Sequence, residues 1–475
     1  MTSPTNSPNR PDDDSTRTPI GLTRRRFLTG SLGVAAGLGL AACGKGSGSV
    51  PGAQGGNSAA LSLSGSAAAS AGGAAGYTGP KVELQFWNGF TGGDGPFMQR
   101  LVDQFNTEHA NISVKMNTMQ WADYYKKLPT AVTTGKGPEV AIMHVDSVAT
   151  NAARNVIQPL DDVAAALQLS ANDFAPVPWK AGIYKDRRFS IPLDVHPLGF
   201  FFNKTVMESA GLDPAKPPTD ADSYAKALEA LKSKGIAGHW ITPFPFTASM
   251  TVQSVIWQFG GDMIAPDASQ VMWADDAGVK GLTWYADMIK QGYSPPKQAQ
   301  DADFVALQNG KSAFNWNGIW AINTMRDVEK AKGGVKWGVA ALPNIGGKPA
   351  AWAGSHQFVL PVLKTPDDNK SLAARVFLNW VSQKSIEWAK GGQVPARNSV
   401  RESPEFAALT EQATLAKQID YLHFPPAVAG IGDAYVEFEK ALNEVVAGGK
   451  DPKTALSDAA GRATKVLEAN KKKYG

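Results

Sequence analysis

The pattern of apolar positions changes abruptly along the chain. From Gly44 to Pro80 the sequence consists mainly of Gly, Ser and Ala with few bulky or charged side chains. Such a segment cannot bury a core and is typical of a flexible tether. From Lys81 onward, apolar residues recur with the periods of strands and helices. The folded part of the protein is therefore expected to begin near residue 81.

The first part of this folded region predicts strands that alternate with helices. Apolar and polar residues alternate at 82–86 and 112–116, and 140–145 is a continuous apolar run, so all three read as strands. Pro96 opens a helical pattern between the first two strands, and a second helical pattern covers 122–134. This order predicts an α/β fold with a mostly parallel sheet and helices outside it.

Later segments are mainly helical in pattern. With 475 residues, the chain is long enough for two or three domain-sized units. No internal repeat and no second long linker interrupts it, so any two lobes are expected to be joined by closely packed crossings. Helices are predicted at residues 220–234, 277–291, 372–390, 433–447 and 451–472.

The amino-terminal segment has the features of an export signal. Arg24 to Arg26 precede a short apolar run, which is too short and too rich in Gly and Ala for a lasting transmembrane helix. The stretch around these arginines resembles a twin-arginine signal. Leu40 to Gly44 resembles a bacterial lipobox, in which Cys43 is lipidated and becomes the first residue. We expect residues 1–42 to be removed and the protein to be anchored through Cys43 on the outer face of the cytoplasmic membrane.

Composition limits the possible partners. The predicted signal carries five arginines against three aspartates, so its removal brings the formal net charge of +4 closer to zero. A nearly neutral chain without a basic stripe is an unlikely nucleic-acid binder. Cys43 is the only cysteine, which excludes an intramolecular disulfide. All 13 tryptophans lie at or after Trp87, which suits a ligand with apolar faces, although most of these rings are expected in the core.

Common catalytic motifs are absent from the sequence. It contains no His-Glu-x-x-His, no Gly-x-Ser-x-Gly and no cysteine cluster. The six histidines show no metal-ligand spacing, so we expect no metal, no cofactor and no catalytic residues. A glycosidase needs only two carboxylates, whose separation in space is invisible in a sequence. A motif search therefore leaves hydrolysis open.

Several stretches, taken in order, resemble one family. They are FWNGFTGGDG (86–95), GKGPEVAIMHVD (135–146), IPLDVHPLGFFFNK (191–204), FNWNGIWAI (314–322), WAGSHQFVLP (352–361) and GQVPARNSV (391–400). Together they are similar to the extracellular solute-binding proteins of carbohydrate ABC importers, the group that includes maltose-binding protein. The resemblance implies two α/β lobes joined by a hinge that closes on the ligand. It places residues 81–194 and 356–396 in the first lobe, and 195–355 and 397–475 in the second.

The resemblance also implies a set of ligand-binding residues. Aromatic rings would cover the apolar faces of a sugar, while carboxylates, amides and arginine would bind its hydroxyls. Core packing is the alternative for the tryptophans, hinge packing for the residues near the crossings, and helix capping for the arginine. The expected residues are Trp87, Asn88, Asp94, Asp146, Asp194, His196, Phe246, Trp320, Trp352, Gly354, His356 and Arg397. His144, two residues before Asp146, departs from the family pattern and is expected to change which hydroxyls are bound there.

The expected function is non-catalytic capture of a sugar or oligosaccharide and its delivery to the permease subunits of an ABC importer. We expect the protein to act as a monomer. Two alternatives remain from the sequence: a surface lipoprotein that hydrolyses glycans, and a solute-binding protein for a non-sugar ligand such as a glycerol phosphodiester or a peptide. The sequence does not specify the sugar, its chain length or its linkage.

Overall fold

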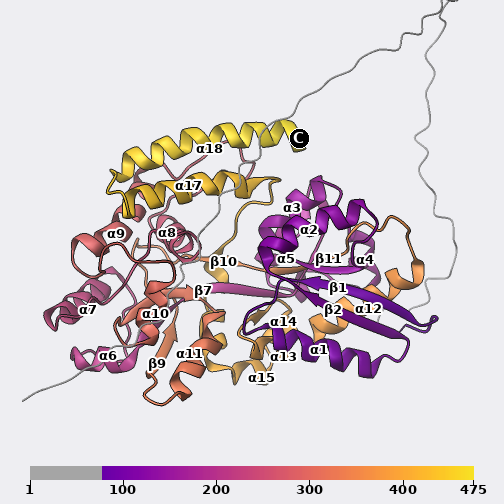
Figure 1. The fold of residues 1–475 in the computed structure, drawn as a ribbon, viewed down its shortest axis with the longest axis horizontal. Helices are drawn as coiled ribbons and strands as arrows, with labels where there is room; N and C mark the ends of the chain where they lie inside the picture. The colour runs from indigo at the N-terminus through magenta and orange to yellow at the C-terminus, as the bar shows by residue number, and fades with distance from the viewer. Residues whose placement is uncertain (1–76) are drawn as a thin grey trace, which may run out of the picture. The chain divides into compact units, whose positions relative to one another are not determined.

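The computed structural model describes residues 77–475 (Figure 1). The predicted signal segment, the predicted lipidation site Cys43 and most of the predicted tether lie outside the described residues. Within residues 77–475, no helix is both long enough and apolar enough to cross a membrane.

The first sheet confirms the predicted alternation of strands and helices. Its strand order is β2-β1-β3-β11-β6, with β1 parallel to β2 and β3, and β11 antiparallel to β3 and β6. Parallel neighbours need long crossover connections, and two helices supply them. These elements are β1 (Val82–Asn88), α1 (Gly95–Glu108), β2 (Ile112–Thr118), α2 (Trp121–Thr133), β3 (Val140–His144), β6 (Ile191–Pro192) and β11 (His356–Val359).

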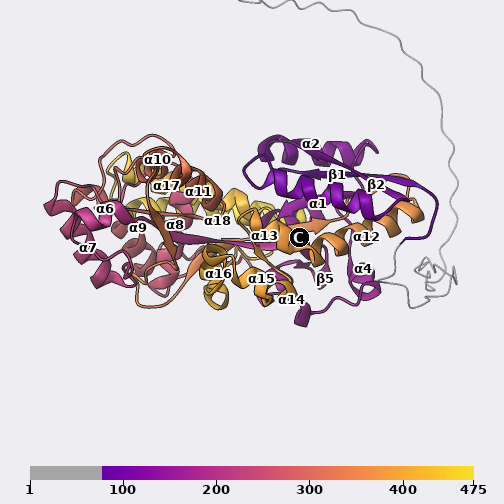
Figure 2. The same ribbon diagram turned by 90° about the horizontal axis from the view of Figure 1, so that it is seen from below.

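Alternation along β1 divides its side chains between two cores. Phe86 packs against Phe377 of α12 (Asp368–Gln383), with ring centroids 5.2 Å apart, and shares a cluster with Phe105 of α1. Trp87 belongs to a second cluster, with Tyr124 of α2. Successive side chains of a strand point to opposite faces, so helices must cover both faces of this sheet. Figures 1 and 2 both show α1 beside α12 on one of them.

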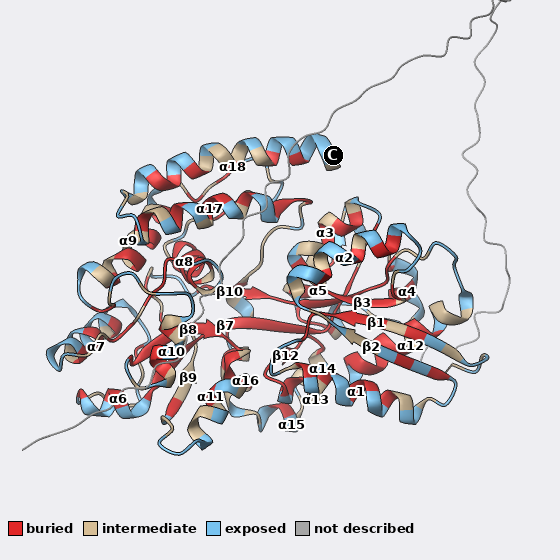
Figure 3. Ribbon diagram, in the orientation of Figure 1, coloured by how far each residue is buried: buried red, intermediate tan, exposed pale blue. Residues whose placement is uncertain are grey.

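The second sheet is built around one long strand. β7 spans 10 residues, all of them buried, and it pairs with β12, β10, β8 and β9 (Figure 3). Its aromatic run Phe200 to Phe202 lies in the largest described core cluster, together with Trp273 and Trp316. The strands are β7 (Asp194–Asn203), β8 (Phe314–Gly318), β9 (Trp337–Ala340), β10 (Ala351–Gly354), β12 (Val394–Pro395) and β13 (Leu422–His423), which extends the sheet beside β10.

Four of the five later helices are confirmed, as α7 (Ala221–Ser233), α9 (Asp276–Lys290), α17 (Ile431–Val446) and α18 (Pro452–Tyr474). The helical stretch predicted over 372–390 is confirmed except for a break at Lys384. The chain forms α12 and then α13 (Ser385–Lys390), because Lys384 leaves helical geometry with φ −93° and ψ 13°. Helix α8 (Thr247–Gln258) was not predicted, since most of its residues are buried and it shows no polar face.

Shorter elements complete the chain. They are α3 (Val145–Ala153), α4 (Asp161–Ala166), α5 (Pro176–Ala181), β4 (Ile183–Tyr184), β5 (Arg187–Arg188), α6 (Lys204–Ser209), α10 (Ala302–Gln308), α11 (Ala321–Lys330), α14 (Asn398–Arg401), α15 (Pro404–Ala407) and α16 (Thr410–Ala416).

The chain passes from one sheet to the other over very short distances. Only Leu193 separates β6 of the first sheet from β7 of the second, and only Ser355 separates β10 of the second from β11 of the first. Leu193 N–H donates to His356 O at 2.9 Å, and Ala396 N–H donates to Leu193 O at 3.1 Å. The two crossings therefore lie side by side. The predicted lobe boundaries, which lie within two residues of these points and of β12, stay a prediction.

Candidate functional site

A buried carboxylate lies where the two crossings meet. Asp194, the first residue of β7, is fully buried and accepts hydrogen bonds through both oxygens. Its Oδ1 accepts from His196 Nδ1 at 3.1 Å and from the His356 backbone N–H at 2.9 Å. Its Oδ2 accepts from His356 Nδ1 at 2.6 Å and from Trp388 Nε1 at 2.7 Å. This one side chain thus binds groups from β7, β11 and α13.

The charge of Asp194 decides how the two histidines are oriented. Burial raises the pKa of Asp194, but attraction to His356 and hydrogen bonds from both histidines outweigh it, so its pKa lies well below the usual value. Burial lowers the pKa of His196, and His356 lowers it further against the opposing effect of Asp194. An ionised carboxylate only accepts hydrogen bonds. His196 and His356 must each donate through Nδ1, which leaves both Nε2 atoms directed elsewhere.

A third histidine reaches the same place from the neighbouring strand. His144 ends β3 and is the register partner of His356 in β11. The Tyr125 hydroxyl lies 2.9 Å from both the Nδ1 and the backbone N of His144. Burial lowers the pKa of His144 well below its usual value, with smaller effects in the same direction from His356 and His196.

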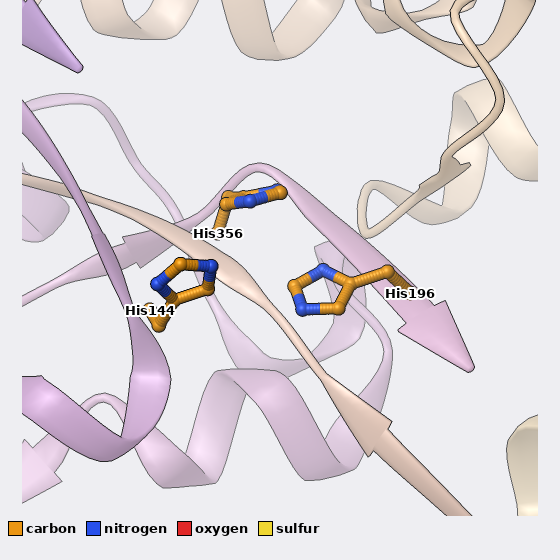
Figure 4. Close-up of side chains that lie close together, drawn as sticks. All are labelled: His144, His196 and His356. Carbon is orange, nitrogen blue, oxygen red and sulfur yellow. The ribbon is translucent and has the colours of Figure 1, made fainter. Parts of the chain in front are cut away.

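The three imidazoles converge although they are far apart in the sequence. One ring nitrogen of each of His144, His196 and His356 lies within 4.8 Å of those of the other two (Figure 4). Among residues 77–475, this is the one group of His, Cys, Asp or Glu side chains with the proximity needed to hold a metal ion. Sequence spacing did not reveal it, because sheet pairing and the crossing bring the rings together.

Aromatic side chains adjoin the histidines from the second sheet and its helices. The His196 ring centroid lies 6.1 Å from that of Trp320 and 6.2 Å from that of Trp352. Phe246 lies 5.4 Å from Trp320. It is 55% exposed and has a φ of 83°, a backbone conformation that costs free energy outside glycine. An exposed aromatic residue in a strained conformation is a feature expected of a binding surface.

A second aromatic pair lies on the side of the first sheet. The half-buried ring of Trp121 stacks on His356 at 5.8 Å with an interplanar angle of 10°, and it lies 4.3 Å from the ring of His144. Tyr125 stacks on Trp121 at 5.7 Å. Sequence reasoning missed both residues. The available signal was their i, i+4 spacing at the start of α2, which places two aromatic rings on one face of a helix.

Two other predicted residues lie close to this group. Asp94 lies just before α1 and is half-buried. Burial raises the pKa of Asp94, the charge of Asp194 raises it further, and His356 lowers it in part. Gly354 is the register partner of His196, and a Cβ atom there would clash with His196 Nε2 and approach the Trp352 ring. Glycine at 354 therefore lets the His196 imidazole lie against the backbone of β10.

Trp87 and Asn88, at the end of β1, are buried by contacts within the first sheet and its helices. Trp87 is only 7% exposed, packs with Tyr124 and has Lys127 Nζ 4.8 Å from its ring. Asn88 is buried, and its Oδ1 accepts from Phe90 N–H at 3.1 Å.

Asp146 lies exposed in the first turn of α3 rather than at the end of β3. Arg397 is buried; it donates to Ser382 Oγ at 3.0 Å and to Asn379 Oδ1 at 2.9 Å, and it lies over the Phe174 ring. Among residues 77–475, the side chain of Arg397 thus contacts α12 and Phe174, and it makes no hydrogen bond with the histidine group.

Comparisons with known proteins identify the family of this chain and its relatives. Residues 100–414 match the family model of the bacterial extracellular solute-binding proteins. A maltooligosaccharide ABC transporter solute-binding lipoprotein of Streptococcus pneumoniae R6 is 25% identical over 302 residues, which cover 60% of this chain and 67% of that protein.

Solved structures share the fold. The cyclic α-maltosyl-1,6-maltose binding protein of Arthrobacter globiformis is 23% identical with a TM-score of 0.70, over 82% of this chain and 100% of that one. UgpB of Mycobacterium tuberculosis, solved with glycerophosphocholine, is 16% identical with a TM-score of 0.71, over 82% and 99%. The described chain thus has the expected two-lobe fold with a hinge between the lobes.

Proposed function

Because this chain belongs to the bacterial extracellular solute-binding proteins, we propose that it captures a carbohydrate between its lobes and passes it to the permease subunits of an ABC importer. The protein performs no reaction on that carbohydrate in this proposal and acts as a monomer. The names of the Streptococcus and Arthrobacter relatives support a sugar as the solute.

The main support is the aromatic lining on both sides of a polar centre. Trp320, Trp352 and Phe246 adjoin His196, while Trp121 and Tyr125 adjoin His144 and His356. Sugars have apolar C–H faces and a rim of hydroxyls, so they need rings for the faces and polar atoms for the rim. Asp94, His196 and His356 supply polar atoms between the two sets of rings.

The local charges favour a neutral ligand over a phosphodiester such as the one bound by the M. tuberculosis protein. The groups whose charges shift the pKa of Asp94, His144 and Asp194 are carboxylates and imidazoles, with no lysine or arginine among them. An anion brought to this centre would meet the negative charges of Asp94 and Asp194, with no lysine or arginine among the groups that shift their pKa values. We therefore place a hydroxyl-rich, uncharged ligand at the site. Trp87, Asn88, Asp146 and Arg397 stay predictions for its periphery.

We also retain the predicted anchoring. Export through the arginine-containing signal and lipidation of Cys43 would hold the protein on the outer face of the cytoplasmic membrane, where the permease lies. The Streptococcus relative is named as a lipoprotein, which supports this part of the proposal.

Calorimetric titration with a ligand panel tests the proposal. The panel contains maltooligosaccharides of several lengths, a cyclic glucan, a mannooligosaccharide and glycerophosphocholine. We expect a sugar to bind, and we expect Trp320→Ala and Trp352→Ala each to weaken binding by about 1–3 kcal/mol. Trp284→Ala is the matched control, because Trp284 is half-buried in the same core but packs on Trp316 and Tyr224.

Two results would contradict the proposal. Binding of glycerophosphocholine in preference to every sugar would show that the charge argument fails. Release of shorter products during incubation with an oligosaccharide, followed by chromatography, would show a hydrolase instead.

A further inference from the structure

We propose that His144, His196 and His356 form a binding site for a divalent transition-metal ion, with Zn²⁺ as the preferred ion. The proposal rests on the convergence of three ring nitrogens within 4.8 Å (Figure 4). It uses His196 and His356, which the proposed function also assigns to the solute, so it is tested without any sugar. Imidazole nitrogens suit Zn²⁺, Cu²⁺ and Ni²⁺, whereas Mg²⁺ and Ca²⁺ take oxygen ligands.

Hydrogen bonds prepare two of the three ligands. Asp194 accepts from Nδ1 of both His196 and His356, so a neutral ring at either position carries its lone pair on Nε2. Histidines that bind metals commonly donate their other N–H to a carboxylate, which fixes the tautomer and the orientation of the ring. Here a single buried carboxylate does this for two rings, and Trp388 Nε1 and the His356 backbone N–H hold that carboxylate in place.

Tyr125 has the same role for the third ligand. Its hydroxyl lies 2.9 Å from His144 Nδ1 and also accepts from the His144 backbone N–H. A phenol oxygen has two lone pairs and can accept both hydrogens. Metal binding would select the tautomer in which Nδ1–H of His144 donates to Tyr125 and Nε2 faces the ion. Each ring thus has its Nδ1 held by a hydrogen bond, while Nε2 of His196 lies close to Gly354 of β10.

Metal binding requires the ligand nitrogens to come closer together. Zn–N bonds of about 2.0–2.1 Å in a tetrahedral site place ligand nitrogens about 3.3 Å apart. Nitrogens that lie within 4.8 Å of one another have to move closer together to reach this separation, through rotation of the rings. Three protein ligands leave a fourth position open, to be filled by water or by an oxygen atom of a ligand.

The ligands come from both sheets, which gives the metal a mechanical effect. His144 and His356 lie on β3 and β11 of the first sheet, and His196 lies on β7 of the second. An ion that binds all three joins the two sheets at the crossings. Metal binding should therefore stabilise the folded protein, because an ion that binds only the folded state shifts the unfolding equilibrium by mass action.

The test is a titration of tag-free, chelator-treated protein with ZnCl₂, followed by calorimetry and without any sugar. We expect one Zn²⁺ per chain, and a loss of affinity of about 100-fold or more in His144→Gln, since changes even in the residues behind metal ligands cost 10–100-fold. His109→Gln is the control; its ring stacks on Phe105 and its Nδ1 contacts Phe105 O. We expect this control to bind like the wild type.

Cobalt provides a readout that depends on no variant. Co²⁺ bound by the wild-type protein is expected to show the intense visible absorption of a four-coordinate site, and Zn²⁺ is expected to displace it. Failure of the wild type to bind Zn²⁺ at millimolar concentration would overturn the proposal. So would equal affinity in His144→Gln and wild type, or a weak six-coordinate Co²⁺ spectrum.

Discussion

Replacing Asp194 with asparagine removes a charge that four donors share. An amide offers one accepting oxygen, so its NH₂ group must replace one of the two carboxylate oxygens. In one orientation the NH₂ faces the His356 backbone N–H, and in the other it faces Trp388 Nε1–H. The histidines can change tautomer to accept a hydrogen, but these two donors cannot. Either orientation leaves at least one buried donor unpaired.

The expected cost follows from these contacts. An unpaired buried donor costs about 1–3 kcal/mol, and each hydrogen bond to a charged group contributes about 1.5–3 kcal/mol. We expect Asp194→Asn to lower the free energy of unfolding by about 2–5 kcal/mol at pH 7, from one unpaired donor and the weakening of the remaining hydrogen bonds. The lowered pKa of Asp194 also predicts that its ionised form stabilises the folded protein. This stabilisation is present above the pKa of the unfolded chain and is lost only as the pH falls through the pKa of the folded protein.

Asp303 is the matched control because its pKa is shifted the other way. It is also buried, at 7% exposure, and burial raises its pKa despite a 2.9 Å hydrogen bond from Asn315 Nδ2. A carboxylate whose pKa is raised on folding costs stability at pH 7. Asp303→Asn keeps an accepting oxygen for Asn315 and removes the buried charge. We expect it to change the free energy of unfolding by less than about 1 kcal/mol, or to stabilise.

Urea denaturation at pH 7, followed by tryptophan fluorescence, measures both variants against the wild type. The urea midpoint should fall clearly in Asp194→Asn and stay nearly constant in Asp303→Asn. The reasoning is refuted if Asp194→Asn lies within about 1 kcal/mol of the wild type, or if Asp303→Asn is the more destabilised of the two.

Three further predictions follow from other features. Phe246→Gly should stabilise the folded protein by about 1 kcal/mol, because glycine tolerates the positive φ at this position. The same change should weaken sugar binding in calorimetry, because it removes the ring beside Trp320. Unchanged stability and unchanged affinity would count against both effects. Small-angle scattering should give a smaller radius of gyration with saturating sugar, since a ligand held by both lobes favours the closed state; identical profiles with binding confirmed would argue for a rigid pocket. Cys43→Ala should release the protein into the medium or leave uncleaved precursor, and normal processing with membrane retention on fractionation would exclude the lipid anchor.

The elements of the first sheet were largely accessible from local pattern. Period-two and period-3.6 repeats depend on which side of an element is buried, so 82–86, 112–116 and 122–134 could be assigned without knowledge of the partners. Helix α8 and the break at Lys384 were not accessible. A helix buried on most sides has no polar face to detect, and the pattern of apolar residues continues across the break.

The candidate site was only partly accessible. Asp194, His196 and His356 were singled out because they lie in stretches that resemble family crossings, but their shared carboxylate was not foreseen. Trp121 and Tyr125 were missed, because an aromatic pair at i, i+4 spacing is equally consistent with core packing. Whether any of the predicted residues contacts the ligand stays a prediction.

The amino-acid sequence by itself determined the α/β class and the family resemblance, since these depend on local period and ordered motifs, and it predicts the export segment whose removal would leave a nearly neutral chain. Tertiary structure alone decided that His144, His196 and His356 meet. Their convergence depends on the β3–β11 register, which pairs His144 with His356, and on single-residue crossings at Leu193 and Ser355, which bring β7 alongside. Strand register and crossing geometry are set by contacts between distant segments, and no local spacing of histidines encodes them.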